Sequence, residues 1–147
     1  MKEMSKVFNC IFGLFLLLMF SSCLKAQSNR VDTVILGNRQ VTINLPEPYK
    51  KKVCNYDEGI FIDYVFQNGS IITLFRGANQ KLPLLSPQQG YTPIKKKQIN
   101  STRISMIGKK ESRYWREDIL GEIRILYDKV PMEDKTKYDA ILDSISY

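Results

Sequence analysis

The stretch 60–75, IFIDYVFQNGSIITLF, contains the strongest local pattern in the chain. Two runs rich in β-branched and aromatic residues, 60–67 and 70–75, flank the pair Asn68-Gly69. Such side chains favour strands. Asn-Gly also accepts the positive φ angles of a two-residue type I′ turn, whose twist matches that of the strands it joins. The stretch therefore predicts a tight β-hairpin, and with it an antiparallel sheet.

Two further strands are expected before this hairpin, over residues 31–36 and 40–45. Apolar and polar residues alternate in the second run, which is typical of a strand with one buried face. Pro46 and Pro48 end it, because proline donates no hydrogen bond to a sheet. Residues 49–58 have no clear periodicity, and a loop or a short helix is expected there.

The segment after the hairpin, residues 77–93, contains three prolines and two glycines and predicts a long connection. A connection of this length is often a functional or mobile element. The favoured alternative is that Leu82, Leu84 and Leu85 pack as a lid over the sheet. Three more strands are expected at about 99–107, 112–120 and 122–130, and the last two flank Gly121 in a second tight hairpin.

The last element predicted is a helix over residues 132–146. Tyr138, Ile141, Leu142 and Ile145 follow one another at i, i+3, i+4 and i+7, which gives a single apolar stripe. An amphipathic helix of this kind must bury its stripe against the sheet. The expected fold class is α+β, a twisted antiparallel sheet of about five to seven strands with a C-terminal helix packed on one face.

The N-terminal residues 1–22 have the composition of a signal peptide. Lys2 and Lys6 precede an apolar run over residues 7–20. The run is shorter than the ~20 residues that a membrane-spanning helix needs, and it has the length of the apolar core of a secretory signal. The chain is therefore expected to be exported.

Two processing sites compete at the end of this segment. The motif FSSC, which ends at Cys23, resembles a bacterial lipobox, in which small residues precede a cysteine that is lipidated after cleavage. The alternative is ordinary cleavage after Ala26, which would release a soluble periplasmic or secreted protein. With Cys23 lipidated, residues 23–30 form a tether, residues 31–147 form a single domain, and the protein is membrane-anchored, facing the periplasm or the cell surface.

The composition excludes several kinds of chemistry. The 147 residues include 22 Lys and Arg, 15 Asp and Glu, three Cys and no His. Without His, neither a conventional Ser or Cys triad nor a Cys/His zinc site can form in the chain. Cys10 leaves with the signal and Cys23 is acylated or removed, so Cys54 remains alone and no intramolecular disulfide is expected. We expect no metal, no cofactor and no enzymatic activity.

Three lysine runs are candidate binding elements. If they gather into one positive patch, they would bind anionic lipid head groups. The alternative is that they are solvated charges that protect strand ends. The export signal argues against nucleic acid as the partner. The runs are Lys50, Lys51 and Lys52; Lys95, Lys96 and Lys97; and Lys109 and Lys110.

Residues 113–116, RYWR, form the one dense aromatic and basic cluster in the sequence. In a strand, Arg113 and Trp115 share one face, while Tyr114 and Arg116 share the other. One aromatic side chain is therefore expected in the core and the other at an exposed contact. All four residues are candidates for binding.

Three adjacent acid pairs, 57–58, 117–118 and 133–134, are expected to be solvated surface acids. Neighbours in a strand point to opposite faces, so a catalytic pair would have to come from distant segments. A small carboxylate-dependent enzyme that acts on glycans, with two acids flanking the scissile bond, is therefore an alternative function.

The order of elements over residues 31–147 resembles that of the PsbP/Mog1-like group of small α+β domains. The similarity includes a strand that ends in INLPEPY and a closing helix with the sequence KYDAILDSI. The resemblance implies a secreted domain that acts mainly by binding proteins, and it assigns no residue a role. The protein is expected to act as a non-enzymatic binding or accessory module of the cell envelope. Its expected partners are an envelope protein and the membrane, to which the N-terminal lipid would attach it.

Overall fold

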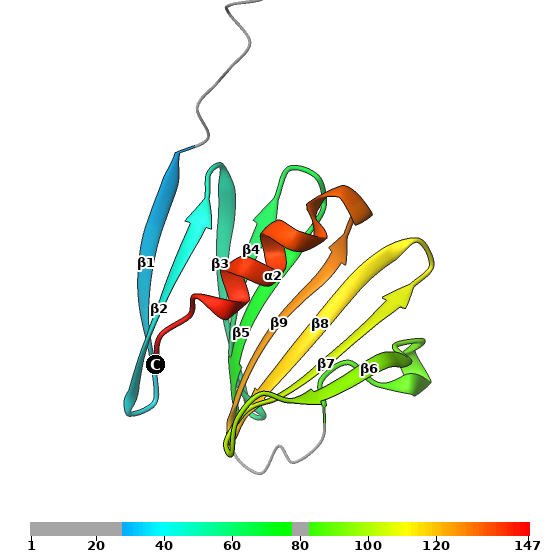
Figure 1. The fold of residues 1–147 in the computed structure, drawn as a ribbon. Helices are drawn as coiled ribbons and strands as arrows, with labels where there is room; N and C mark the ends of the chain where they lie inside the picture. The colour runs from blue at the N-terminus through cyan, green and yellow to red at the C-terminus, as the bar shows by residue number, and fades with distance from the viewer. Residues whose placement is uncertain (1–27, 78–82) are drawn as a thin grey trace, which may run out of the picture.

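The computed structural model describes residues 28–77 and 83–147 (Figure 1). The expected signal peptide, Cys23 and most of the expected tether lie outside the described residues, as does Leu82 of the expected lid. No helix in the described part of the chain is long and apolar enough to cross a membrane.

Nine strands, two short 3-10 helices and one α-helix make up the described fold. In chain order they are β1 (Asn29–Leu36), β2 (Arg39–Pro46), β3 (Tyr49–Tyr56), β4 (Gly59–Phe66), β5 (Ile71–Arg76), η1 (Pro87–Gln89), β6 (Pro93–Gln98), β7 (Ile104–Lys110), β8 (Arg113–Leu120), β9 (Ile123–Val130), η2 (Met132–Asp134) and α2 (Lys135–Asp143).

The strands form two antiparallel sheets. Among the strands, β1 and β2 pair only with each other, and the other seven form a sheet in the order β3-β4-β5-β9-β8-β7-β6. Two meanders, β3-β4-β5 and β6-β7-β8-β9, meet where β5 pairs with β9. The α+β description therefore fits in outline: the large sheet has seven strands, within the expected five to seven, although the structure is mostly β and contains a second, two-stranded sheet that was not expected.

The hairpin of β4 and β5 is present, but its turn differs from the expected type. The amide of Phe66 donates to the carbonyl of Ser70 at 3.0 Å, so the loop has three residues. Gly69 has φ +80°, whereas Asn68 is not among the residues with positive φ. This is the three-residue alternative to a type I′ turn. The Asn68 side chain accepts a hydrogen bond from the Ser70 amide at 3.0 Å, which stabilises the longer loop.

The expectation of a loop or short helix at residues 49–58 is wrong. Strand β3 occupies most of this segment and pairs with β4 along its whole length, from Tyr49 opposite Phe66 to Tyr56 opposite Gly59. It is an edge strand whose side chains are mostly exposed on both faces. An alternating pattern arises only when one face is buried, so this strand has none.

The strands after the long connection also differ in part from the expected ones. Strand β6 was not expected, and β7 begins at Ile104 because Asn100 ends the preceding segment in a turn. Its side-chain oxygen accepts from the amides of Thr102 at 2.9 Å and Arg103 at 2.8 Å. Strands β8 and β9 have the expected positions, and the tight turn at Gly121 is confirmed.

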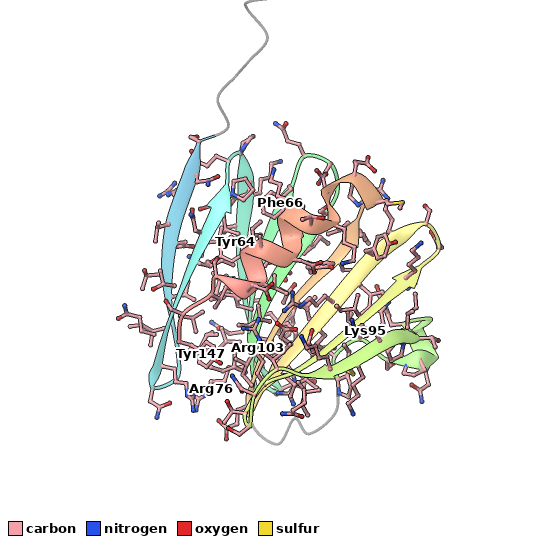
Figure 2. All side chains as sticks on the ribbon, in the orientation of Figure 1. Tyr64, Phe66, Arg76, Lys95, Arg103 and Tyr147 are labelled. Carbon is pink, nitrogen blue, oxygen red and sulfur yellow. The ribbon has the colours of Figure 1, made fainter. Side chains whose placement is uncertain are left out.

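One face of the large sheet carries the main core, and we call it the helix face. Helix α2 and the β1-β2 hairpin cover it together (Figure 1). Tyr64 and Phe66 lie between sheet and helix (Figure 2), and the ring of Phe66 is 5.4 Å from that of Tyr138. All four residues of the expected helical stripe are buried.

The C-terminal helix is shorter than expected. A 3-10 turn occupies the first three residues of the predicted range, and α2 ends at Asp143. The chain beyond it is held to the small sheet, because Thr42 and Ser146 exchange backbone hydrogen bonds at 2.9 and 3.3 Å. This pairing joins the end of the chain to β2 and closes the layer over the helix face.

Residues 83–91, which we call the strap, cross the opposite face of the sheet. Tyr91 packs edge-on against Trp115 at 5.8 Å between ring centroids. These two residues and Met106 form a second, smaller core, with Leu85 packed against it. Leu85 of the expected lid is therefore packed over the sheet, and the strap covers part of this face, which we call the strap face.

Candidate functional site

The first two lysine runs do not form one patch. Lys50–Lys52 lie on β3 and Lys95–Lys97 on β6, and these strands are the two opposite edges of the seven-stranded sheet. Lys95 lies on the outer strand, well away from β3 (Figure 2). A seven-stranded sheet separates its edge strands by about 29 Å, at ~4.8 Å per spacing. The hypothesis of a single lysine patch is therefore wrong.

The positions of these runs support the alternative that they protect strand edges. Every residue of β6 is exposed, so its backbone edge is open to solvent. Charged side chains, lysine above all, prevent such an edge from pairing with another chain. On β3, Lys51 has a further role, since its Nζ is 2.7 Å from a carboxylate oxygen of Asp32 on β1.

The cluster 113–116 is divided between the two faces of β8, as expected. Trp115 is completely buried under the strap, which identifies it as the core aromatic. Tyr114 is half-buried on the helix face, with Lys109 Nζ 4.6 Å and Lys135 Nζ 5.6 Å from its ring centroid. Its ring is therefore covered by two cations and is not a free contact surface.

Arg116 is not an exposed binding residue, which corrects its assignment as a candidate. Its guanidinium is 4% exposed and donates to both oxygens of Asp118 at 2.9 Å and to Asp143 at 2.7 Å. Arg103 donates to the same Asp118 carboxylate and to the carbonyl of Leu142 at 3.0 Å. Two arginines, one in the turn before β7 and one on β8, thus join these segments to α2 through one fully buried aspartate.

The hydrogen bonds of this network attach α2 to the sheet. Burial disfavours the charged guanidinium of Arg116, but hydrogen bonds from it to Asp118 and Asp143 outweigh that cost and raise its pKa. Burial and the charge of Asp139 raise the pKa of Tyr127, whose hydroxyl donates to that carboxylate at 2.9 Å. Both groups keep their protons at neutral pH, and their hydrogen bonds are used within the fold.

The expectation that the acids 117–118 are solvated is wrong, although they do point to opposite faces. Glu117 is completely buried under the strap, where its oxygens accept from the amides of Leu84 at 2.7 Å and Leu85 at 2.9 Å. Burial raises the pKa of Glu117 in spite of these hydrogen bonds. Its role is to hold the strap on the sheet, since a buried carboxylate needs such partners.

A pocket of about 370 Å³ lies where the β4-β5 turn, the β7-β8 turn and the end of β9 meet, and we call it the turn pocket. By the strand pairing, the side chains of residues 110, 113 and 128 all belong to the strap face here. The strap supplies one wall. The residues that line the pocket include Asn68, Tyr91, Lys110, Arg113, Asp128 and Lys129.

The backbone around the turn pocket is unusual. Glu111 has φ +56° and Lys129 has φ +59°, and in the described residues no other residue except glycine has a positive φ. Both line this pocket, as does Gly69 with φ +80°. Left-handed conformations of such residues are strained and cluster at functional sites. This makes the turn pocket the strongest candidate site in the described structure.

The cations of the turn pocket form no ion pair with a carboxylate elsewhere in the described chain, unlike Arg103 and Arg116. Lys110 Nζ lies 4.2 Å from the centroid of the Tyr91 ring. Arg113 donates one hydrogen bond, to the carbonyl of Lys129 at 3.3 Å. These two basic side chains line the pocket with most of their hydrogen-bonding capacity unused.

An acid completes the pocket. Asp128 accepts from the hydroxyl of Tyr91 at 2.7 Å and from the amide of Lys129 at 2.8 Å. Burial and the hydrogen bond to Asp128 raise the pKa of Tyr91, so its hydroxyl remains a donor. The carboxylate is thus held in place and fixes the strap against the pocket.

The candidate residues named from the sequence and the residues that line the turn pocket overlap only in part. Arg113 and Lys110 were singled out by their basic neighbours, whereas Tyr91, Asp128 and Lys129 were not, because they come from other segments. No group of three or more Cys, Asp and Glu residues in the described parts of the chain is arranged to hold a metal ion. The lone Cys54 is half-buried on the edge strand β3.

No family model, no curated protein and no solved structure matches this chain. The PsbP/Mog1-like resemblance therefore remains a prediction. The function has to be argued from the residues of the chain and from the geometry described above.

Proposed function

We propose that this chain is an exported, lipid-anchored protein of the cell envelope that acts as a binding module and not as an enzyme. The observation that carries the proposal is the succession of the apolar run 7–20 and Cys23 at the start of the sequence. Covalent lipid would provide attachment, each buried CH₂ contributing about 0.8 kcal/mol and several chains together giving lasting anchorage.

The position of the first strand supports this proposal. Strand β1 begins at Asn29, six residues after Cys23. The chain between these two residues reaches at most about 20 Å when fully extended. A lipid on Cys23 would therefore hold the folded domain directly at the membrane surface, where its partners would be envelope components.

The geometry also favours binding over catalysis. The buried acids Glu117 and Asp118 lie on opposite faces of β8, and each is engaged in holding an element of the fold. The turn pocket is lined by basic side chains, which are suited to binding a ligand. No observation on Glu117 or Asp118 supports the oriented pair of general acid and general base that a glycosidase requires.

The test is incorporation of labelled fatty acid into the protein in its own host, followed by membrane fractionation. We expect the parent to carry label and to sediment with membranes, and Cys23→Ala to lose both properties. Cys54→Ala is the matched control and should remain labelled, because Cys54 lies within strand β3. An unlabelled parent with Gln27 as its N-terminus would exclude the lipid anchor.

A further inference from the structure

We infer that the turn pocket binds the phosphoryl group of a membrane phospholipid whose head group has a net negative charge, with Lys110, Arg113 and Lys129 as its cationic ligands. This inference rests on the proposed function in one respect, since the N-terminal lipid is what would keep the pocket at the membrane. The pocket chemistry stands by itself and can be tested on protein that carries no lipid.

The pocket lies at the end of the domain from which the tether leaves. Within the large sheet, the antiparallel pairings place the β4-β5 turn, the β7-β8 turn and the end of β9 at one end. Figure 1 shows the start of β1, these turns and η2 along one end of the sheet. An anchor about 20 Å long at most would thus bring the end that holds the pocket to the head groups.

The charges of the pocket suit a phosphoryl group. Lys110, Arg113 and Lys129 line it, against the two acids Glu111 and Asp128. Asp128 is engaged by the Tyr91 hydroxyl and a backbone amide, whereas the three cations have no carboxylate partner in the described chain. Arginine and lysine are the usual ligands of phosphate oxygens.

The shape of the pocket also suits this ligand. Its volume of about 370 Å³ leaves room for a phosphoryl group and part of a head group. The left-handed residues Glu111 and Lys129 belong to the β7-β8 turn and to the end of β9, so strand pairing holds the backbone on two sides of the pocket. Such preorganisation lowers the entropy that binding would otherwise cost.

On an anchored protein, a site of low affinity is sufficient for binding to the head groups. The net charge of the lining residues is only +1, since three cations face two acids. An N-terminal lipid would raise the effective concentration of head groups at the pocket to the level of an intramolecular contact. The pocket would therefore orient the domain on the membrane, leaving the opposite end of the sheet for a partner protein.

The experiment uses the processed Cys23→Ala protein, which has no lipid, and vesicles of zwitterionic phospholipid with or without about 30% anionic phospholipid, a content at which surface charge attracts basic side chains. The pocket variant carries Lys110→Gln, Arg113→Gln and Lys129→Asn, the last because asparagine tolerates a left-handed backbone. The control variant carries Lys95→Gln, Lys96→Gln and Lys97→Gln on the exposed strand β6. Both variants lose three positive charges, and circular dichroism checks that both are folded.

We expect the parent and the control to bind anionic vesicles and the pocket variant to bind them about a hundredfold more weakly, at roughly fivefold per basic residue. Equal weakening of both variants would overturn the inference, because it would indicate diffuse attraction to the surface. Absence of binding by the parent would overturn it too, as would an equally strong interaction with zwitterionic vesicles.

A second arm distinguishes lipid from soluble phosphate. Titration of the same proteins with glycerol phosphate should give weak binding by the parent that the pocket variant loses. Tight binding of the soluble ester without binding to vesicles would show that the ligand is not a membrane lipid. None of these results depends on acylation, so a failure of the lipid anchor would appear only in the labelling of Cys23.

Discussion

Replacing Asp118 by asparagine tests whether the buried arginine network holds α2 to the sheet. The Asp118 side chain is completely buried and accepts hydrogen bonds from both Arg103 and Arg116. The substituted amide would keep the shape of the side chain but remove the charge that neutralises two guanidinium groups. Breaking a buried ion pair in this way typically costs about 3–5 kcal/mol, because an uncompensated buried charge remains.

The structure places the expected cost at the lower end of that range. After the change, Arg116 retains Asp143 at 2.7 Å and Asp139 at 3.4 Å, while Arg103 retains the carbonyl of Leu142 at 3.0 Å. We therefore expect Asp118→Asn to lower the free energy of unfolding by about 3 kcal/mol. With a urea m-value of about 1–3 kcal/mol/M, the midpoint should fall by about 1 M or more.

Asp143→Asn is the matched control. It removes a carboxylate from the same network, but its side chain is 63% exposed, so solvent screens the charge. We expect it to cost less than about 1 kcal/mol in the same urea titration. If Asp118→Asn costs no more than Asp143→Asn, the buried network does not stabilise the fold and the reasoning is wrong.

Two further predictions concern the turn of the hairpin and two carboxylates, the buried Glu117 and the half-buried Asp32. Gly69→Val should lower the free energy of unfolding by about 1–2 kcal/mol through its backbone alone, because φ is +80° and a Cβ there would meet no atom within 4 Å; an unchanged urea midpoint would contradict the described turn. The raised pKa of Glu117 means that the folded protein holds this proton more tightly than the unfolded chain, so stability from this group is lost as pH rises through the folded pKa. Relative to Glu117→Gln, the parent should therefore gain stability as pH falls from neutrality towards the ordinary value of 4.5, as measured by urea unfolding at a series of pH values. Burial alone would raise the pKa of Asp32, but hydrogen bonds from Lys51 and Tyr64 outweigh it and lower the pKa. The comparison with Asp32→Asn should therefore slope the other way, and the parent should lose stability below about pH 4. Parallel slopes for the two carboxylates would refute one of the two assignments, and the sign of the slope would show which.

The elements that the sequence predicted well are those with one buried face. Residues 40–45 alternate because their apolar side chains pack under α2, and the stripe of the C-terminal helix meets the same core. Strands β3 and β6 have no such face, since they are the exposed edges of the sheet. Their consecutive lysines interrupt the alternation of apolar and polar residues that would otherwise indicate a strand. The same lysines prevent the exposed edges from pairing with another chain.

The candidate site was harder to predict, because it is made by pairing between distant strands. Tyr91 and Asp128 are 37 residues apart in the chain and form one wall of the turn pocket. The buried charges were missed for a related reason. Arg116 and Asp118 are charged residues of the kind usually found on a solvated strand. Only the packing of α2 over β8 shows that they are enclosed.

Strand β8 connects these features, and it explains why a pocket at one end of the sheet depends on groups buried in its middle. On the helix face, Asp118 fastens α2; on the strap face, Glu117 fastens the amides of the strap. The strap in turn carries Tyr91, whose hydroxyl positions Asp128 and whose ring supports Lys110 at the pocket. Loss of the Glu117 carboxylate would release this wall without touching a ligand. Glu117→Gln should therefore weaken binding to anionic vesicles while the three pocket cations remain in place, a result that a merely diffuse attraction of the lysines for the membrane would not give.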